Sequence, residues 1–190
     1  MLINIIFLFL YLYVKIEVGD VRMDYEIIFE SDRIYFIKIT EKLLNEYLNM
    51  VNDYDVKKYI NLSKDENKIT KEQELEWINN KLNSNAVIFS MLEKDTNNYI
   101  GNIEIMSINN NKGELGIAIT RNMQDKHFGQ ESIKTLLKYA FNTLKLEEVF
   151  LKVYDFNLRG IACYEKVGFE RYDYDKEHTI YMKVRSEDYE

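Results

Sequence analysis

The hydrophobic pattern of the chain changes its period near residue 120, and this change restricts the folds open to it. Three runs rich in β-branched and aromatic residues come first, at 86–92, 99–108 and 114–120. Short polar clusters at 95–98 and 109–113 separate them. Because such runs, when bounded by turn residues, form strands, we expect a meander of three strands here.

After Gly129 the apolar residues follow helical spacing instead. They occur at Ile133, Leu136, Leu137, Ala140, Phe141 and Leu144. Residues 148–153 then resemble a strand, 158–166 a helix, and 169–172 and 179–184 closing strands. A meander followed by alternating strands and helices predicts an α/β (α+β) fold, in which a mixed sheet carries helices on its faces.

The segment before the meander also carries strand and helix signals. Residues 33–39 alternate loosely and are rich in β-branched and aromatic residues, which is typical of a strand. Helical spacing follows at Leu43, Leu44, Tyr47, Leu48 and Val51. Thr70 and Gln73 have the spacing of a capping box, which predicts a helix carrying Leu75, Ile78 and Leu82.

Composition narrows the classes of function. The 190 residues hold 25 basic and 32 acidic side chains, for a net charge of −7, and no basic stripe, so we expect no nucleic-acid partner. An acidic balance suits a cationic substrate such as an amine. The one cysteine is Cys163, and the two histidines are His127 and His178. The sequence therefore predicts neither a disulfide framework nor a metal site.

No repeat or low-complexity linker divides the chain, so we predict one domain over residues 23–190. Residues 1–22 stand apart, because 2–14 form an apolar run broken only by Asn4. This run is shorter than the ~20 residues that span a bilayer, and it lacks the basic region and cleavage site of a signal peptide. Three interpretations stay open: an extra strand or interface segment, translation upstream of a start at Met23, or a membrane anchor. We expect a cytoplasmic protein whose fold does not need residues 1–22.

The turn at residues 124–129, Gln-Asp-Lys-His-Phe-Gly, connects a predicted strand to a predicted helix. Such a turn directs unpaired backbone N–H groups and the positive end of the helix dipole towards one point, which suits a phosphate. Gly129 permits close approach of the backbone, and Lys126 adds a positive charge. The alternative is an ordinary strand-to-helix turn.

A second informative segment runs over residues 157–169, Asn-Leu-Arg-Gly-Ile-Ala-Cys-Tyr-Glu-Lys-Val-Gly-Phe. Asn157 is a suitable N-cap for a helix and Gly168 a suitable C-terminal stop. Tyr164 falls on this helix near the apolar face formed by Ile161 and Val167. Taken alone, a tyrosine in this position is more often a core residue with a hydrogen-bonded hydroxyl.

Together the two segments resemble the GNAT superfamily of N-acetyltransferases. The family's pyrophosphate loop reads Gln/Arg-x-x-Gly-x-Gly/Ala, and here His127 replaces the first glycine, which should narrow the backbone conformations available there. The later family pattern is met by Asn157, Gly160, Tyr164, Glu165, Lys166, Gly168 and Phe169. Residues 100–104 and 113–116 resemble strands of the ribosomal-protein and spermidine (diamine) acetyltransferase branch, and the resemblance covers about residues 28–184.

In this family acetyl-CoA lies in a splay between two neighbouring parallel strands, here 114–120 and 148–153. The resemblance therefore implies a mostly antiparallel sheet with one parallel, splayed strand pair and helices on both faces. It implies acetyl-CoA as cosubstrate and no metal. The residues that it implies for the cofactor site are Ile117, Ala118, Ile119, Gln124, Lys126, His127, Phe128, Gly129, Gln130, Asn157 and Tyr164.

The implied reaction is direct attack of a primary amine on acetyl-CoA, with Tyr164 as the general acid that protonates the leaving thiolate. Glu104 and Glu114, on adjacent predicted strands, are the candidate bases, and we prefer Glu104. Either could equally be a solvated strand residue or a charge that attracts the substrate. Cys163 has no histidine in a partner position, so we interpret it as a small buried residue rather than a nucleophile.

The acceptor stays open among a polyamine, a protein N-terminus and other small-molecule or peptide amines. Homodimers are common in the family, so a homodimer is a further possibility. Two alternatives come from other classes of protein. One is a non-catalytic acetyl-CoA-binding sensor or interaction module, and the other is a protein tethered to a membrane through residues 2–14.

Overall fold

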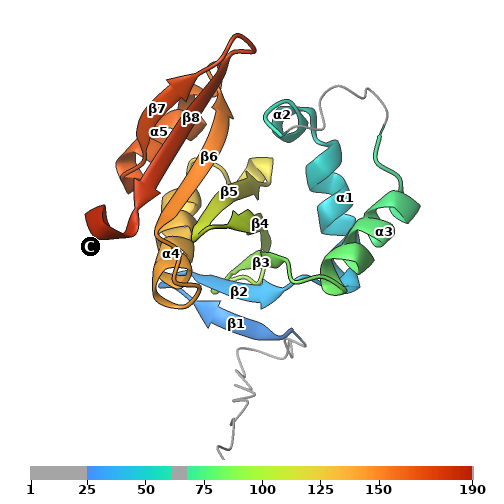
Figure 1. The fold of residues 1–190 in the computed structure, drawn as a ribbon. Helices are drawn as coiled ribbons and strands as arrows, with labels where there is room; N and C mark the ends of the chain where they lie inside the picture. The colour runs from blue at the N-terminus through green and yellow to red at the C-terminus, as the bar shows by residue number, and fades with distance from the viewer. Residues whose placement is uncertain (1–24, 61–67, 190) are drawn as a thin grey trace, which may run out of the picture.

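The structure, a computed structural model, describes residues 25–60 and 68–189. The interpretations of residues 1–22 lie outside this part of the chain. Within it, eight strands form one sheet in the order β1-β2-β3-β4-β5-β6-β8-β7 (Figure 1). The strands are β1 (Ile27–Glu30), β2 (Ile34–Lys38), β3 (Val87–Glu93), β4 (Tyr99–Asn109), β5 (Lys112–Ile119), β6 (Glu148–Tyr154), β7 (Glu170–Tyr174) and β8 (Thr179–Arg185).

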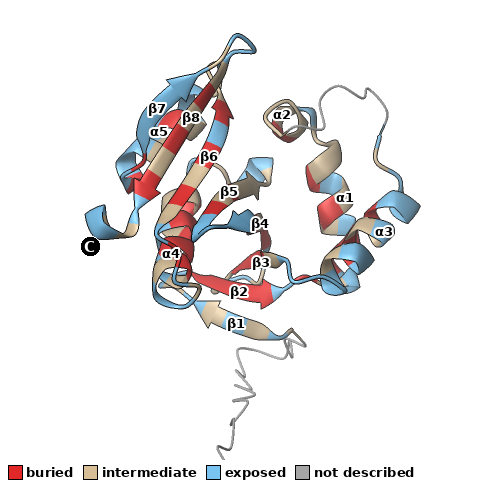
Figure 2. Cartoon of the chain, in the orientation of Figure 1, coloured by how far each residue is buried: buried red, intermediate tan, exposed pale blue. Residues whose placement is uncertain are grey.

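All neighbouring strands are antiparallel except β5 and β6, which are parallel. The predicted meander is β3, β4 and β5, and each pairs with the next along the chain. β8 pairs with β6, which leaves β7 at the edge of the sheet, exposed along its whole length (Figure 2). The predicted fold class, a mixed and mostly antiparallel sheet with one parallel strand pair, is confirmed.

Helices cover both faces of the sheet. They are α1 (Leu44–Asn52), α2 (Tyr54–Lys57), α3 (Lys71–Leu82), α4 (Phe128–Asn142) and α5 (Leu158–Val167). Alternate residues of β2 enter two separate buried clusters: Phe36 packs in the larger one with residues of α4 and α5, whereas Ile37 packs in the smaller one with residues of α1 and α3. Because successive strand residues point to opposite faces, the two clusters lie on opposite sides of the sheet. Figure 1 shows α1, α2 and α3 grouped together, away from α4 and α5.

Local signals in the sequence fix several helix ends. The backbone N–H of Gln73 donates to Thr70 Oγ1 at 3.3 Å, and the N–H of Thr70 donates to Gln73 Oε1 at 2.9 Å. This reciprocal pair is the predicted capping box, and it starts α3. Gly168 ends α5 with φ +109°, in the left-handed region that favours glycine.

Two elements were not predicted, and both are short. β1 spans four half-buried or exposed residues, and α2 is a single turn capped by Asp53, whose Oδ1 accepts from the N–H of Asp55 at 2.8 Å. Segments of four residues are too short to show a period in the hydrophobic pattern. β7 also starts and ends later than expected, because an exposed edge strand has no apolar alternation to mark its bounds.

None of the helices within residues 25–60 and 68–189 has the length and apolar composition needed to cross a bilayer.

We predict that Gly101→Ala lowers the free energy of unfolding by about 1–3 kcal/mol, the usual cost of overpacking. A Cβ at Gly101 would lie 2.0 Å from the carbonyl oxygen of Ala118, so β4 and β5 would have to separate. Gly168→Ala is the matched control, because nothing lies within 4 Å of its Cβ position and only backbone strain opposes the change. Urea unfolding of both variants measures the difference. An equal or smaller loss at Gly101 would contradict the close approach of the two strands.

Candidate active site

The parallel strands β5 and β6 part shortly after they begin. Their pairing covers Lys112–Glu114 on β5 and Glu148–Phe150 on β6, and no later residue of either strand pairs with the other. Both strands continue, β5 to Ile119 and β6 to Tyr154. The sheet therefore opens towards the carboxyl ends of these two strands, which is the splay that the sequence predicts.

The open edge of β5 carries backbone groups that face the splay. The N–H of Thr120 donates to the carbonyl of Ile100 at 2.9 Å, so the even-numbered residues of β5 bond with β4. In an antiparallel ladder the alternate residues direct their N–H and C=O groups to the other side. The backbone N–H and C=O groups of Ile117 and Ile119 therefore point away from β4, towards the side of β5 that no longer pairs with β6. Gln124 Nε2 donates to the carbonyl of Ile119 at 2.9 Å, and the remaining groups can bond an extended ligand.

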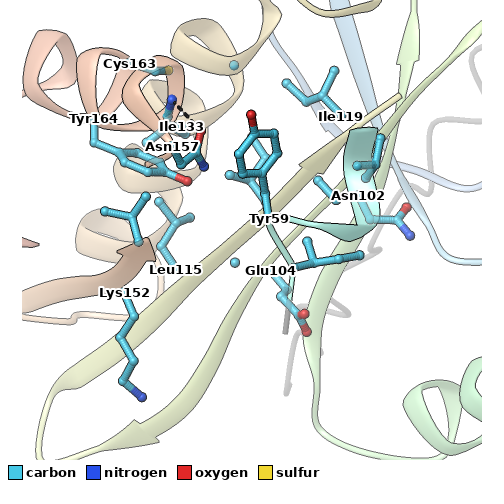
Figure 3. Close-up of a pocket in the computed structure, with 18 of the residues that line it drawn as sticks. Tyr59, Asn102, Glu104, Leu115, Ile119, Ile133, Lys152, Asn157, Cys163 and Tyr164 are labelled. Atoms are coloured by element: carbon cyan, nitrogen blue, oxygen red, sulfur yellow. Dashed lines mark hydrogen bonds between the residues drawn. The ribbon is translucent and has the colours of Figure 1, made fainter. Parts of the chain in front are cut away.

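A cavity of about 1360 Å³ occupies the splay and extends between the sheet and α1–α3. A pocket for one drug-sized ligand measures roughly 300–1,000 Å³, so this cavity has room for two reactants. Nearly all the residues predicted for the site line it: Glu104, Glu114, Ile117, Ala118, Ile119, Gln124, His127, Phe128, Gly129, Gln130, Asn157 and Tyr164. In Figure 3, Tyr164 and Asn157 lie on the α5 side of the cavity, whereas Glu104 and Asn102 lie on the β4 side.

The turn before α4 contains two residues other than glycine with a positive φ. His127 occupies the N-cap position with φ +66° and ψ +7°, and Asp125 also has a positive φ of +61°. No side chain caps the helix. The amides of Phe128, Gly129 and Gln130 begin a helix and so have no intrahelical acceptor, which makes this end of α4 suitable for an anion. The substitution of histidine for glycine thus leaves the αL conformation in place at a cost of roughly 1–2 kcal/mol.

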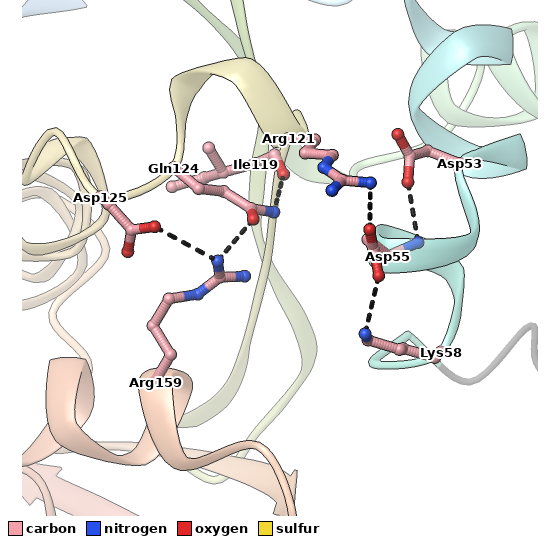
Figure 4. Close-up of polar contacts among 8 residues, drawn as sticks. All are labelled: Asp53, Asp55, Lys58, Ile119, Arg121, Gln124, Asp125 and Arg159. Carbon is pink, nitrogen blue, oxygen red and sulfur yellow. Dashed lines mark hydrogen bonds and ion pairs between the residues drawn. The ribbon is translucent and has the colours of Figure 1, made fainter.

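A further cation, Arg159, reaches this loop besides the predicted Lys126. Lys126 is absent from the cavity lining, and its Nζ lies 3.6 Å from Met123 Sδ. Arg159 of α5 lines the cavity instead: one of its guanidinium nitrogens donates to Gln124 Oε1 at 2.5 Å and lies 3.9 Å from Asp125 Oδ2 (Figure 4). The sequence places Arg159 in the first turn of a predicted helix, but nothing local shows that this turn meets the 124–129 loop.

Tyr164 is half-buried on α5, and its ring packs edge-on against Phe169 with the ring centroids 6.0 Å apart. Its hydroxyl bonds with no described residue, unlike a tyrosine whose role is structural. Burial raises the pKa of Tyr164 well above 10, and the neighbouring Cys163 adds to the rise. The hydroxyl therefore stays protonated at neutral pH and can donate into the cavity.

Asn157 and Gly160 fix the start of α5. Asn157 Oδ1 accepts from the backbone N–H of Gly160 at 3.0 Å, as expected of an N-cap. A Cβ at Gly160 would lie 2.6 Å from Asn157 Nδ2, so this cap needs glycine. Cys163 is half-buried and lines the cavity, so the prediction of a fully buried residue is wrong. Burial raises the pKa of its thiol, which disfavours the thiolate that a nucleophile needs.

Each candidate base forms an ion pair with a lysine. Lys81 Nζ of α3 lies 2.6 Å from Glu104 Oε2, and Lys152 Nζ of β6 lies 3.3 Å from Glu114. Gly116, opposite Glu104 on β5, leaves space for this carboxylate, because a Cβ at Gly116 would lie 3.1 Å from Glu104 Cγ. Both carboxylates line the cavity on the face of the sheet that α1–α3 cover.

Two contacts hold α2 against the opposite side of the splay. Arg121, directly after β5, forms an ion pair with Asp55 of α2, which also binds Lys58 (Figure 4). The ring of Tyr59 stacks on Phe156, from the β6–α5 connection, with the ring centroids 5.9 Å apart. The two walls of the cavity are therefore linked across its mouth.

The sequence matches the family model described as an acetyltransferase (GNAT) domain over residues 33–170. The chain belongs to the GNAT acetyltransferase family. The family predicted from residues 124–129 and 157–169 is therefore confirmed.

Individual GNAT relatives agree in sequence and in fold. The spermidine N(1)-acetyltransferase of Vibrio cholerae is 33% identical over 99 residues, which cover 50% of this chain and 57% of that protein. A prophage-derived, uncharacterized N-acetyltransferase of Bacillus subtilis is 32% identical over 96 residues, covering 50% and 54%. The chain thus spans just over half the length of these two relatives. The crystal structure of a Vibrio cholerae spermidine N-acetyltransferase with CoA and spermine superposes with a TM-score of 0.74 at 21% identity, covering 84% of this chain and 99% of that one.

We predict that His127→Gly raises the free energy of unfolding by about 1 kcal/mol, because glycine adopts the αL backbone without the steric cost of a Cβ. His127→Ala keeps the Cβ and serves as the control. Urea unfolding compares the three proteins. If the glycine variant is no more stable than the alanine variant, the backbone at residue 127 is not strained.

Proposed function

We propose that this GNAT protein transfers the acetyl group of acetyl-CoA to a primary amine by direct attack. The observation that carries the proposal is the splay itself. One cavity combines an open strand edge, an uncapped helix N-terminus and the protonated hydroxyl of the half-buried Tyr164. Family membership supports the same reaction.

The residues present fit acetyl-CoA. The pantetheine arm is an extended chain with amide groups, and the backbone groups of Ile117 and Ile119 could bond it as a neighbouring strand would. The amides at the start of α4 suit the pyrophosphate. Arg159, and not the Lys126 ammonium, supplies positive charge from a residue that lines the cavity. Asn157 would contact the cofactor from the α5 side, with Ala118, Gln124 and Gln130 completing the wall.

In the proposed reaction the amine nitrogen forms a bond to the thioester carbonyl carbon, and the carbon–sulfur bond breaks. Most of the acceleration comes from holding the two reactants in line within one cavity. Tyr164 gives its hydroxyl proton to the leaving sulfur, a general-acid role typically worth ~10²–10⁴-fold. The ammonium first gives one proton to Glu104 or Glu114, directly or through water, and the carboxylic acid later releases it to solvent. The nitrogen gives up a second proton as the carbon–sulfur bond breaks, and a proton returns to the Tyr164 oxygen through water.

For the acceptor we propose a polyamine, a protein N-terminus or another small amine. Both candidate bases lie on the α1–α3 side of the sheet, where the cavity extends away from Tyr164. The acidic net charge favours a cationic acceptor over an anionic one, and one relative is named for spermidine. A cytoplasmic location and a homodimer stay predictions from the sequence.

The alternative is a sensor that binds acetyl-CoA without turning it over. Both functions need the cofactor site, but only the enzyme needs Tyr164 as a general acid. Thiol release from acetyl-CoA in the presence of an amine separates the two functions, because a sensor gives none.

We predict that Tyr164→Phe lowers turnover by ~10²-fold or more, measured as thiol release over a panel of amines. The melting temperature should change little, because the hydroxyl that is lost has no partner among the described residues. Tyr172→Phe is the matched control, since Tyr172 is an exposed residue of β7 outside the cavity. A Tyr164→Phe protein with wild-type turnover would remove Tyr164 from the mechanism.

A further inference from the structure

The turn between β1 and β2 holds the start of α4 from outside the cavity. Glu131, in the first turn of α4, directs its carboxylate to this turn. Glu131 Oε1 accepts from the Ser31 hydroxyl at 2.7 Å and from the backbone N–H of Arg33 at 2.8 Å. Glu131 Oε2 lies 2.8 Å from both Nε and Nη2 of the Arg33 guanidinium. Neither Arg33 nor Glu131 lines the cavity, so these contacts flank the site rather than enter it.

The contacts with the β1–β2 turn fully satisfy the Glu131 carboxylate. An ionised carboxylate has about four acceptor positions, and the contacts with Ser31 and Arg33 occupy them. Burial raises the pKa of Glu131, but the hydrogen bonds from Ser31 and Arg33 outweigh this effect, so the pKa lies below its usual value. Glu131 is therefore ionised at neutral pH, and the Arg33 guanidinium compensates its charge.

The charge of Glu131 matters because of its place in α4. The positive end of a helix dipole favours a carboxylate in the first turn as it favours a bound anion. Glu131 lies within about one helical turn, ~5 Å along the axis, of the amides that we propose for the pyrophosphate. Residues 124–131 carry two acidic side chains, Asp125 and Glu131, and one basic side chain, Lys126. Cations from other elements must therefore make this end of α4 suitable for an anion, and Arg33 and Arg159 supply them.

Arg33 also orients one peptide unit of the loop. Its Nη1 donates to the backbone carbonyl of Lys126 at 3.2 Å, and its guanidinium lies over the ring of Phe128, with Cζ 4.6 Å from the ring centroid. In a trans peptide the carbonyl and the following N–H point in opposite directions. The N–H of His127 is therefore directed away from Arg33, and His127 lines the cavity. One guanidinium thus neutralises a carboxylate and keeps a carbonyl dipole away from the side where an anion would bind.

We propose that Arg33 is a positioning residue of the cofactor site, which neutralises Glu131 and holds the Lys126 carbonyl so that the positive end of α4 is left to the pyrophosphate of acetyl-CoA. This rests on the proposed binding of acetyl-CoA at the splay. Arg33 touches neither reactant and takes no part in bond making. Its removal should weaken binding of the cofactor and leave the chemical step unchanged.

Calorimetry with CoA measures this role without any turnover. Arg33→Gln leaves the Glu131 carboxylate without a compensating charge, so the Kd for CoA should rise ~3- to 30-fold, the range that a charge at a helix end covers. The ratio of this Kd to that of wild type should shrink in ~1 M salt, where charges are screened beyond ~3 Å. In a thiol-release assay the KM for acetyl-CoA should rise by a similar factor, with kcat unchanged.

Glu131→Gln carries the opposite expectation, because it removes the charge that Arg33 compensates. The variant should melt earlier than wild type, since Ser31 and Arg33 lose an ionised partner, yet it should bind CoA at least as tightly. The double variant Arg33→Gln/Glu131→Gln should recover most of the affinity that Arg33→Gln loses. A purely structural contact would instead weaken CoA binding in all three variants. Glu131→Gln and the double variant decide the proposal even if Arg33→Gln fails to fold.

Lys94→Gln is the matched control. Lys94 Nζ lies 3.2 Å from Glu30 Oε2 and 5.1 Å from the ring centroid of Tyr35. Lys94 therefore resembles Arg33 in pairing with a carboxylate and a ring, but these partners belong to β1 and β2 rather than to α4. The Kd of Lys94→Gln for CoA should equal that of wild type.

The outcomes separate this role from the proposed function. If wild-type protein does not bind CoA, the proposed cofactor site fails, and the role of Arg33 fails with it. If wild-type protein binds CoA but releases no thiol with any amine, only the proposed transfer fails, and the binding measurements still decide the role of Arg33. An unchanged Kd in Arg33→Gln, or weaker CoA binding in Glu131→Gln, would overturn that role while the proposed function stands.

Discussion

The parting of β5 from β6 is the constraint on which the rest of the structure depends. In a sheet covered by helices on both faces, each buried backbone N–H or C=O group without a hydrogen-bond partner destabilises the folded state by about as much as a lost hydrogen bond. β5 nevertheless continues for five residues beyond its last pairing with β6. Gln124 compensates one carbonyl, at Ile119, and the cavity keeps the others accessible. An open edge inside a covered sheet is stable only if water or a ligand completes its hydrogen bonds, so the splay is a suitable place for an extended ligand to bind.

The splay also lies between two walls of the cavity, and each wall belongs to its own buried hydrophobic cluster. The α4–α5 wall has its own buried cluster, with Phe128 and Ile161, and the α1–α3 wall has another, with Tyr47 and Ile78. Polar and aromatic contacts join them at the rim, through Arg121 and Asp55 and through the stacked rings of Tyr59 and Phe156. The cavity is thus lined by two walls of different chemistry. The α4–α5 wall offers backbone amides and a tyrosine hydroxyl, whereas the carboxylates of Glu104 and Glu114 come from the sheet, on the face that α1–α3 cover.

His127, which departs from the family pattern, takes αL backbone angles, which glycine adopts without a steric cost. The amides that follow it begin α4 and have no intrahelical acceptor. Lys126 turns away towards Met123, whereas Arg159 reaches the loop from a different helix. The positive charge beside this loop on the cavity side therefore comes from a residue that is distant in the chain.

The sequence by itself determined the types of the longer elements, the capping box of α3, the N-cap of α5 and the loop before α4. These signals act over three or four residues, through side-chain periodicity and hydrogen bonds to nearby backbone. Tertiary structure alone decided that β8 lies between β6 and β7, where the β5–β6 pairing stops, and that Arg159 meets Gln124. It also decided that Lys81 of α3 pairs with Glu104 of β4. Each of these facts depends on residues distant in the chain meeting in space, and neither composition nor spacing records which of them meet.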